Sequence, residues 1–295
     1  MTVLVFLDPI HPNGRIADAS KPQLMATDLG ATRGDGVFES LLARDGKPRK
    51  LQAHLDRLAT SAASLELTIP APAQWERAIA TAIARHHAED PASELVVKLL
   101  VTRGVEGASA PTAWVQVSAV TRKSRQQREA GLAITLLDRG YNSTAAERAP
   151  WLLMGAKTLS YAVNMAALRY AHAKGFDDAI FTSSDGMVLE GPTSTVLLAT
   201  DRDGVKTLQT PLLKSGVLPG TTQGALFTAA DAAGWCLGYG PLVPQDLFEA
   251  DGVWLASSIR LLAPVNSIDG QSLSTTSDAG NALTVELTAL LESAL

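Results

Sequence analysis

The stretch MGAKTLSYAVNMAALRYAHAKG, Met154 to Gly175, places one lysine between an apolar run at 151–154 and a second apolar-rich segment. The spacing in that second segment predicts a helix over 161–174, closed by Gly175. A lysine at a helix start commonly keeps its ammonium in water. Lys157 could instead be a Schiff-base lysine. That role requires apolar neighbours that favour the neutral amine, and the 151–154 run could supply them.

Tyr161 follows Lys157 by four residues. The two side chains would share a helix face if the helix began early enough. In that case the phenol could hydrogen-bond the phenolic oxygen of a pyridoxal ring.

The bulk properties limit the class of protein. The chain has 295 residues, a net charge of -5 and one cysteine, Cys236. Its length predicts about two domains of roughly 100–200 residues each. The charge gives no reason to expect nucleic acid or an anionic membrane as a partner, and the single cysteine excludes an internal disulfide. No metal site is expected. The N-terminus lacks a basic region and no apolar run reaches 18 residues, so we expect a cytoplasmic protein without a membrane segment.

The first half has the pattern of a small α+β domain. Strands are predicted over 3–7, 36–43, 94–102 and 112–120, and helices over 50–67 and 74–87. The second half is predicted to have strands over 132–137, 179–182, 187–189, 195–199, 205–207, 235–239 and 253–256. Its helices are predicted over 161–174, 221–233 and 279–295. The polar run at 122–130 is interpreted as the interdomain linker, which gives domains 1–121 and 131–295.

Two motifs in the second half have both a structural and a chemical interpretation. In SDGMVLEGPTSTVLL (184–198), Glu190 follows an apolar strand. It could be a solvated strand end, or the partner of a cofactor's pyridinium nitrogen. In LPGTTQGALF (218–227), Thr221 or Thr222 could simply cap a helix. The same helix start could also bind a phosphate through free N–H groups and the two hydroxyls.

Two arginines in the first half are similarly open. Arg57, in HLDRL (54–58), could be an exposed helix residue or a bidentate phosphate ligand. Arg103 ends the strand LLVT, before a glycine. It could be a solvated charge or could bind a carboxylate.

The order of these motifs is more specific than any one of them. DLGATRGDGVFES (28–40), HLDRL, VTRG, AKTLSY, LEGPTSTV and LPGTTQ succeed one another along the chain. In that order they resemble the fold-type IV pyridoxal-phosphate enzymes, from about Asp28 to Val265. The resemblance implies a mixed α+β fold of two domains: a small α+β N-terminal domain and a larger domain with a mixed sheet and helices. It further implies a homodimer with the active site between the domains.

The resemblance also implies roles for single residues. Lys157 would bond to pyridoxal 5'-phosphate, Glu190 would pair with the pyridinium nitrogen, and Tyr161 would contact the phenolic oxygen. The phosphate would be bound by Arg57, Thr221, Thr222 and Ser258. Arg103 and Arg33 could each bind one substrate carboxylate. The roles of Asp35, Asn164 and Arg260 stay open.

Among these enzymes the motifs look most like the aminodeoxychorismate lyases. These release pyruvate and 4-aminobenzoate, a folate precursor, from 4-amino-4-deoxychorismate. Arg33 replaces a tyrosine of branched-chain aminotransferases and favours an anionic substrate. Thr195 and Gln223 replace an asparagine and an arginine that many relatives have. The alternatives are an aminotransferase for D-amino or branched-chain amino acids, and a non-catalytic dimeric binding protein with a degenerate site.

Overall fold

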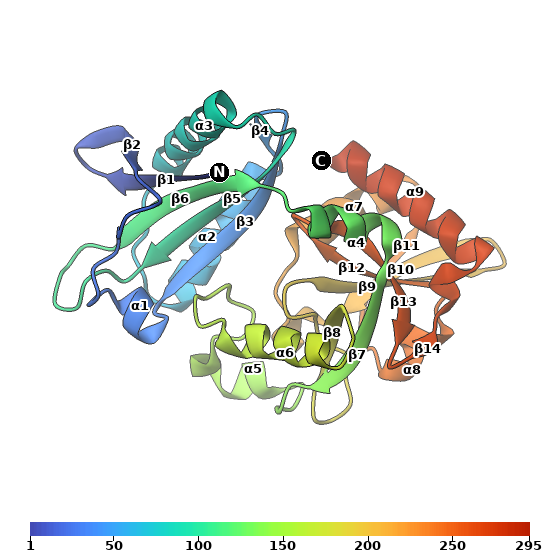
Figure 1. Ribbon diagram of the computed structural model, residues 1–295. Helices are drawn as coiled ribbons and strands as arrows, with labels where there is room; N and C mark the ends of the chain where they lie inside the picture. Colours follow the sequence, from blue (N-terminus) through green and yellow to red (C-terminus); the bar gives the residue numbers. More distant parts are fainter. The chain divides into compact units, whose positions relative to one another are not determined.

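The structure is a computed structural model that describes residues 1–295 and separates into two compact units (Figure 1). Unit 1 contains Met1–Thr121 together with Ala156–Tyr161. Unit 2 contains Arg122–Gly155 and Ala162–Leu295. Each unit combines helices with one sheet, so the expected mixed α and β fold is confirmed. The segment with Lys157 belongs to unit 1, whereas the domain limits predicted from sequence assign it to 131–295.

Unit 1 is built on a six-stranded antiparallel sheet with the order β2-β1-β6-β5-β3-β4. The strands are β1 (Thr2–Asp8), β2 (His11–Ala17), β3 (Gly36–Arg44), β4 (Lys47–Pro48), β5 (Glu94–Thr102) and β6 (Thr112–Ala119). The helices are α1 (Leu29–Arg33), α2 (Leu51–Ser64) and α3 (Pro72–Glu89). β3 and β5 pair along their whole length, from Gly36 opposite Thr102 to Arg44 opposite Glu94. The start of β3 therefore lies beside the end of β5.

The helices of unit 1 pack through apolar stripes. On α3 the buried residues Trp75, Ile79 and Ile83 recur every four positions and face β1, β2 and β6. Burying each such side chain stabilises the fold by about 1.5–3 kcal/mol. α2 packs on β3 instead. The helix that carries Arg57 is therefore held beside the strand GVFE.

Unit 2 has a mixed sheet with the order β11-β10-β9-β12-β13-β7-β8, and β14 pairs with β13. The strands are β7 (Leu132–Asp138), β8 (Asp178–Thr182), β9 (Thr195–Arg202), β10 (Val205–Pro211), β11 (Cys236–Gly240), β12 (Gly252–Ser257), β13 (Leu261–Ile268) and β14 (Gln271–Ser272). The α-helices are α4 (Arg122–Ala130), α5 (Ala145–Arg148), α6 (Ala162–Ala173), α7 (Thr221–Ala232), α8 (Pro244–Glu249) and α9 (Asp278–Ala294). Short 3-10 turns are η1 (Pro150–Leu152), η2 (Leu213–Ser215) and η3 (Ser274–Thr276).

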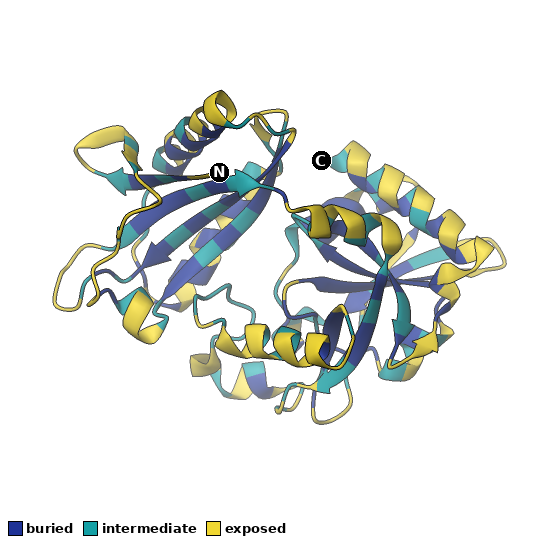
Figure 2. Cartoon of the chain, viewed as in Figure 1, coloured by how far each residue is buried: buried dark blue, intermediate teal, exposed yellow.

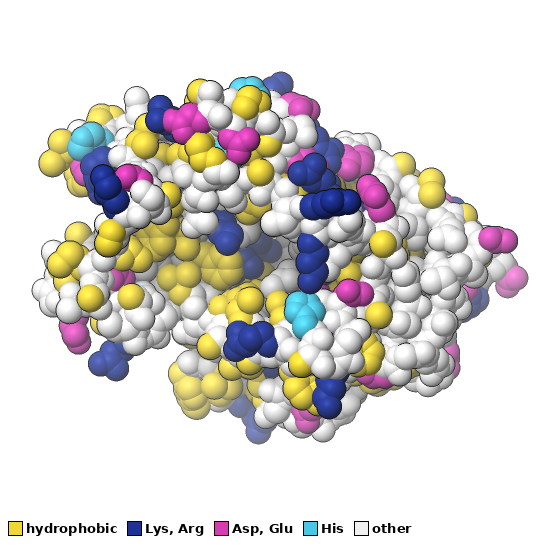
Figure 3. Space-filling model, viewed as in Figure 1, with side chains coloured by type: hydrophobic (Ala, Val, Ile, Leu, Met, Phe, Trp, Pro, Cys, Tyr) yellow, Lys and Arg dark blue, Asp and Glu magenta, His cyan; other side chains and the backbone are white.

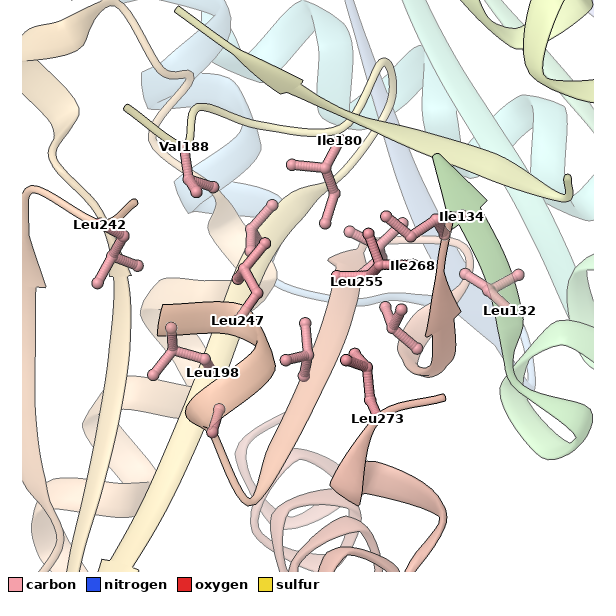
Figure 4. Close-up of a cluster of buried hydrophobic side chains, with 14 of the residues drawn as sticks. Leu132, Ile134, Ile180, Val188, Leu198, Leu242, Leu247, Leu255, Ile268 and Leu273 are labelled. Atoms are coloured by element: carbon pink, nitrogen blue, oxygen red, sulfur yellow. The ribbon is translucent and has the colours of Figure 1, made fainter. Parts of the chain in front are cut away.

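One apolar cluster holds the middle of this sheet together (Figure 4). It joins Leu132 and Ile134 on β7, Ile180 on β8, Leu255 on β12 and Leu247 on α8, all almost fully buried. The cluster fixes β8 against β7. The residues that follow β8, including Glu190, therefore start from a rigid base.

The predicted linker at 122–130 is wrong, because these residues form helix α4 of unit 2. The Arg, Lys, Gln and Glu residues that make this segment polar are also strong helix formers. α4 packs on β13, Arg128 Nη2 donates to the Ile259 carbonyl at 2.6 Å, and Asn266 Nδ2 donates to the Ala130 carbonyl at 2.8 Å. The polar sequence of 122–130 therefore indicates an exposed helix and not a linker.

Other differences from the expected elements are local. Residues 187–189 form no strand, since only an isolated bridge joins Val188 to Thr182. The helix expected to begin at Tyr161 begins at Ala162. Four strands, β2, β4, β13 and β14, were not predicted. β13 contains Pro264, which has no N–H to donate to a neighbouring strand and so lowers the strand signal. No helix of the chain combines the length and the apolarity needed to cross a bilayer.

Candidate active site

The segment around Lys157 is tied to β3 by backbone hydrogen bonds. Phe38 N donates to the Lys157 carbonyl at 3.0 Å, and Leu159 N donates to the Gly36 carbonyl at 2.8 Å. On the other side, Lys157 N donates to the Ser61 hydroxyl of α2 at 3.1 Å. A Cβ at Gly36 would lie 2.7 Å from Leu159 Cδ1, so a glycine in GDGVFE permits this close approach. Lys157 is therefore an extended residue on the edge of unit 1, and the helix-start interpretation is wrong.

Aromatic rings surround the amine of Lys157. Its Nζ lies 4.5 Å from the ring centroid of Phe38 and 5.7 Å from that of Tyr161. The two rings are in contact edge to face, with centroids 5.3 Å apart. Trp151, expected to form part of an apolar wall for this amine, is 75% exposed and lies in the turn η1 of unit 2. Tyr161 therefore approaches Lys157 through the extended segment and not through a shared helix face.

A buried carboxylate orients Arg57. Glu39, fully buried on β3, accepts from Arg57 Nε at 2.7 Å and from Arg57 Nη2 at 2.9 Å. His54 Nδ1 lies 2.7 Å from the same carboxylate, and a nitrogen facing a carboxylate carries the hydrogen. Two side chains from α2 thus converge on one from β3. The guanidinium of Arg57 is held in one orientation before any ligand binds.

The electrostatics of this cluster follow from its burial. Burial by itself raises the pKa of Glu39, but hydrogen bonds from His54 and Arg57 and the charge of Arg57 outweigh it and lower the pKa to about 2. Burial lowers the pKa of His54 against the opposing effect of Glu39, and the positive charges of Arg57 and Lys157 lower it further. Glu39 is therefore a carboxylate and His54 a neutral imidazole at pH 7.

The two arginines proposed for substrate carboxylates differ in their surroundings. Arg103 donates to the Asp35 carboxylate through Nε at 2.7 Å and Nη2 at 3.2 Å. It also donates to the carbonyls of Leu65 at 2.7 Å and Glu66 at 3.3 Å, at the end of α2. Four of its five N–H donors are thus used, and the hydrogen bond that Arg103 donates to Asp35 raises the pKa of Arg103. Arg33 is exposed at the end of α1.

Glu190 lies in the connection between β8 and β9 of unit 2, just before a turn at 192–193. Its carbonyl accepts from Phe181 N at 2.9 Å, which ties it to β8. Its carboxylate accepts from Leu218 N at 3.1 Å, in the segment that leads into α7. This acceptor group is therefore fixed close to the LPGTT sequence, although 28 residues separate Glu190 from Leu218.

Three hydroxyl groups meet at the start of α7. Thr221 Oγ1 lies 3.2 Å from Ser258 Oγ, and Thr222 Oγ1 lies 3.4 Å from it. The residue before the helix, Gly220, provides no side-chain cap for the first N–H groups. Those amides, the positive helix end and three hydroxyls form a suitable set of donors for a phosphate dianion.

A buried ion pair supports the turn that carries Ser258. Arg260 Nη1 donates to Asp178 Oδ2 at 2.6 Å, and both side chains are almost completely buried. Arg260 N also donates to the Ser257 hydroxyl at 3.2 Å. A break in this pair would leave an uncompensated buried charge, so the pair holds the turn firmly. The open question about Arg260 is thereby answered in structural terms.

The candidate residues thus form two groups. Unit 1 brings together Lys157, Tyr161 and Arg57, and unit 2 brings Glu190 close to the segment that carries the hydroxyl cluster. Sequence reasoning overlooked Glu39 and His54, although both lie inside the quoted motifs GDGVFE and HLDRL. The pattern that could have indicated Glu39 is a carboxylate among the apolar residues of a strand, since a buried carboxylate requires a charged partner. Unit 1 therefore holds an amine beside an oriented guanidinium, and unit 2 holds a carboxylate and a set of hydroxyl and amide donors; pyridoxal phosphate requires groups of these kinds.

The comparisons with known proteins agree with this chemistry. Residues 36–268 match the family model described as amino-transferase class IV. The chain is 47% identical, over 88% of its length and 91% of the relative's, to a bifunctional aminodeoxychorismate lyase / D-amino acid transaminase of Mycobacterium tuberculosis. It is also similar to a solved structure, the PLP-bound form of a hypothetical aminotransferase from Mycobacterium tuberculosis, with 42% identity and a TM-score of 0.91. That match covers 100% of this chain and 98% of the other. A second solved structure is a hypothetical aminotransferase from Mycobacterium tuberculosis in its alpha-ketoglutarate and PMP bound form. It is 43% identical to this chain with a TM-score of 0.91, and the match covers 99% of this chain and 98% of the other.

Proposed function

Because the chain belongs to the class IV aminotransferase family, an enzyme family that uses pyridoxal 5'-phosphate, we propose that it is a 4-amino-4-deoxychorismate lyase. The reaction would release pyruvate and leave 4-aminobenzoate. The observation that carries this proposal is the 47% identity to a relative named for that activity over nearly the whole of both chains. The candidate site supports it with an amine, a carboxylate and a phosphate cradle of the required kinds.

Each residue group has a defined task in this reaction. Lys157 would hold the cofactor through its amine, and Glu190 would keep a proton on the ring nitrogen. The bound cofactor supplies a conjugated ring that accepts the electron pair left when the amine-bearing carbon loses its proton. The amine of Lys157, in its neutral form, would take that proton from the substrate carbon. The aromatic rings of Phe38 and Tyr161 would fix the position of this amine, because their centroids lie 4.5 and 5.7 Å from Nζ.

Phosphate binding is assigned to Arg57, Thr221, Thr222 and Ser258. The buried carboxylate of Glu39 holds the guanidinium of Arg57, so little orientational entropy remains to be lost on binding. Expulsion of pyruvate makes the substrate ring aromatic. That change is strongly downhill, so the main requirement on the protein is to orient the substrate.

D-amino acid transamination at the same site is the second candidate. It is favoured by the double name of the 47% identical relative and by the neighbouring structure with alpha-ketoglutarate and PMP. Lys157 would then move the proton to a second carbon instead of assisting elimination. Both activities need the same cofactor-binding residues. They differ in the substrate, because aminodeoxychorismate carries a group that can leave as pyruvate and a D-amino acid does not.

We further propose that the enzyme is a homodimer. α6 is rich in apolar residues, yet Ala171 is its single buried residue (Figure 2). Val163 is 59% exposed and Tyr170 is 54% exposed, and the surface at the position of α6 shows apolar side chains together with basic ones (Figure 3). A second copy covering this face would remove a large apolar patch from water. Sedimentation analysis of the wild-type protein and of Val163→Glu tests this, and a monomeric wild-type protein would refute it.

The two activities are separated by their products. The purified protein with added pyridoxal phosphate is incubated with 4-amino-4-deoxychorismate, and 4-aminobenzoate and pyruvate are measured by chromatography. A parallel reaction with a D-amino acid and a 2-oxo acid is analysed for a new 2-oxo acid. We expect 4-aminobenzoate in the first reaction. Its absence, together with a new 2-oxo acid in the second, would assign the transaminase activity alone.

A further inference from the structure

Arg139 lies directly after β7, and its side chain contacts two aromatic residues, Phe181 and Tyr141. Its guanidinium carbon is 4.5 Å from the ring centroid of Phe181, and its Nε donates to the Tyr141 hydroxyl at 3.4 Å. Its Nη1 is buried and has no hydrogen-bond partner in the protein. An unsatisfied buried N–H costs about 1–3 kcal/mol, so this arrangement is not explained by stability alone.

Asn164 connects this arginine to the turn that follows Glu190. Arg139 Nη2 donates to Asn164 Oδ1 at 3.2 Å, and Asn164 Nδ2 donates to the Pro192 carbonyl at 2.7 Å. The first bond uses the amide oxygen of Asn164 as the acceptor, and the second uses one of the two N–H donors of its amide nitrogen. Pro192 is two residues after Glu190. A chain of two hydrogen bonds therefore extends from β7 through α6 to the Glu190 turn.

Arg139 and Glu190 also line the same small cavity, with Tyr141, Phe181, Leu189 and the segment 215–217. They are the two charged residues in this lining. Opposite charges interact more strongly across a partly desolvated space than in water. The lining of the cavity thus contains one cationic residue and the residue whose carboxylate is assigned to the cofactor's ring nitrogen.

We propose that Asn164 and Arg139 are positioning residues for Glu190. Asn164 anchors the turn at Pro192, while Arg139 orients the Asn164 amide and supplies the positive charge in the cavity that Glu190 lines. The inference rests on the proposed function, since Glu190 must bind the ring nitrogen for its position to matter. It answers the question that the sequence left open for Asn164.

The test compares cofactor binding with folding in matched variants. Asn164→Asp keeps the volume and the acceptor for Arg139, but it removes the N–H donated to Pro192. Asn164→Ala removes both contacts. Asn266→Ala is the control, because Asn266 also donates its side-chain amide to a backbone carbonyl of unit 2, that of Ala130 at 2.8 Å. Apoproteins are titrated with pyridoxal phosphate, the visible absorption band is followed, and the thermal midpoint of each apoprotein is recorded.

Loss of the hydrogen bond to Pro192 predicts an increase of about five- to tenfold in the Kd for pyridoxal phosphate in Asn164→Asp, and at least that increase in Asn164→Ala, which loses both hydrogen bonds. Their absorption maximum should shift, because the carboxylate at the ring nitrogen is displaced. Asn266→Ala should keep the Kd within about twofold of wild type, even if its thermal midpoint falls.

Equal affinity and an unshifted band in wild type and Asn164→Asp would overturn the inference. Equal losses of affinity in Asn164→Ala and Asn266→Ala would also overturn it, since they would indicate a general structural effect. A wild-type protein that takes up no pyridoxal phosphate would overturn the proposed function itself, and the inference with it. Arg139→Lys keeps the charge without the planar donors, and we expect an affinity between those of wild type and Asn164→Ala.

Discussion

Replacement of Glu39 by glutamine should destabilise the protein strongly, because Glu39 is the fully buried partner of Arg57 and His54. A glutamine would keep one oxygen for Arg57 but would place an N–H group against the other donors. The guanidinium of Arg57, with 12% of its side chain exposed, would lose its neutralising carboxylate. Breaking a buried pair of this kind costs about 3–5 kcal/mol.

The pKa of Glu39 provides an independent magnitude. It falls from an ordinary value of 4.5 to about 2 on folding. A difference of that size corresponds to about 3 kcal/mol of stability. Because the folded-state pKa is the lower one, this stabilisation is complete above the unfolded-state pKa and is lost as the pH falls from 4.5 towards 2. At pH 3 less than about half of it should remain.

Urea denaturation followed by circular dichroism gives the free energy of unfolding for wild type and Glu39→Gln between pH 7 and pH 3. Glu76→Gln is the matched control, because Glu76 is exposed on α3 of the same unit. We expect a loss of about 3 kcal/mol at pH 7 for Glu39→Gln and a difference that narrows below pH 4.5. A loss below about 1 kcal/mol at pH 7, or a difference that does not change down to pH 3, would refute this reasoning.

Three further predictions concern other parts of the site. Lys157→Ala should lower turnover by at least about 100-fold, and borohydride should no longer attach pyridoxal phosphate to the protein; retained attachment would exclude Lys157 as the amine. Asp35→Asn removes the negative charge that pairs with Arg103. If Arg103 binds the substrate, the KM for a dicarboxylate substrate should fall about two- to fivefold; an unchanged KM would assign Arg103 a structural role. Asp178→Leu alone should lower the free energy of unfolding, measured by urea denaturation, by about 3–5 kcal/mol. The double variant with Arg260→Met should recover most of that stability, and equal losses in the single and double variants would contradict the role of a buried ion pair.

Much of the secondary structure was predictable because it depends on local periodicity. The helix α3 and the strand β5 follow directly from the spacing of their apolar residues. The prediction of a linker at 122–130 failed because a polar run can arise from a linker or from an exposed helix. The polar run at 122–130 is typical of a linker, yet Arg, Lys, Gln and Glu also favour a helix, and contacts with β13 decided the outcome.

The sequence by itself determined the residue types of the candidate site and their order along the chain, because chemistry limits which side chains can act as amine, carboxylate or phosphate donor. Only the tertiary structure decided their partners. Glu39 meets Arg57 across 18 residues, Asp35 meets Arg103 across 68, and Asp178 meets Arg260 across 82. Such pairings depend on strand register and helix packing, which bring together side chains that no local pattern connects. The same reason explains why Phe38 lies beside the amine of Lys157, although 119 residues separate them.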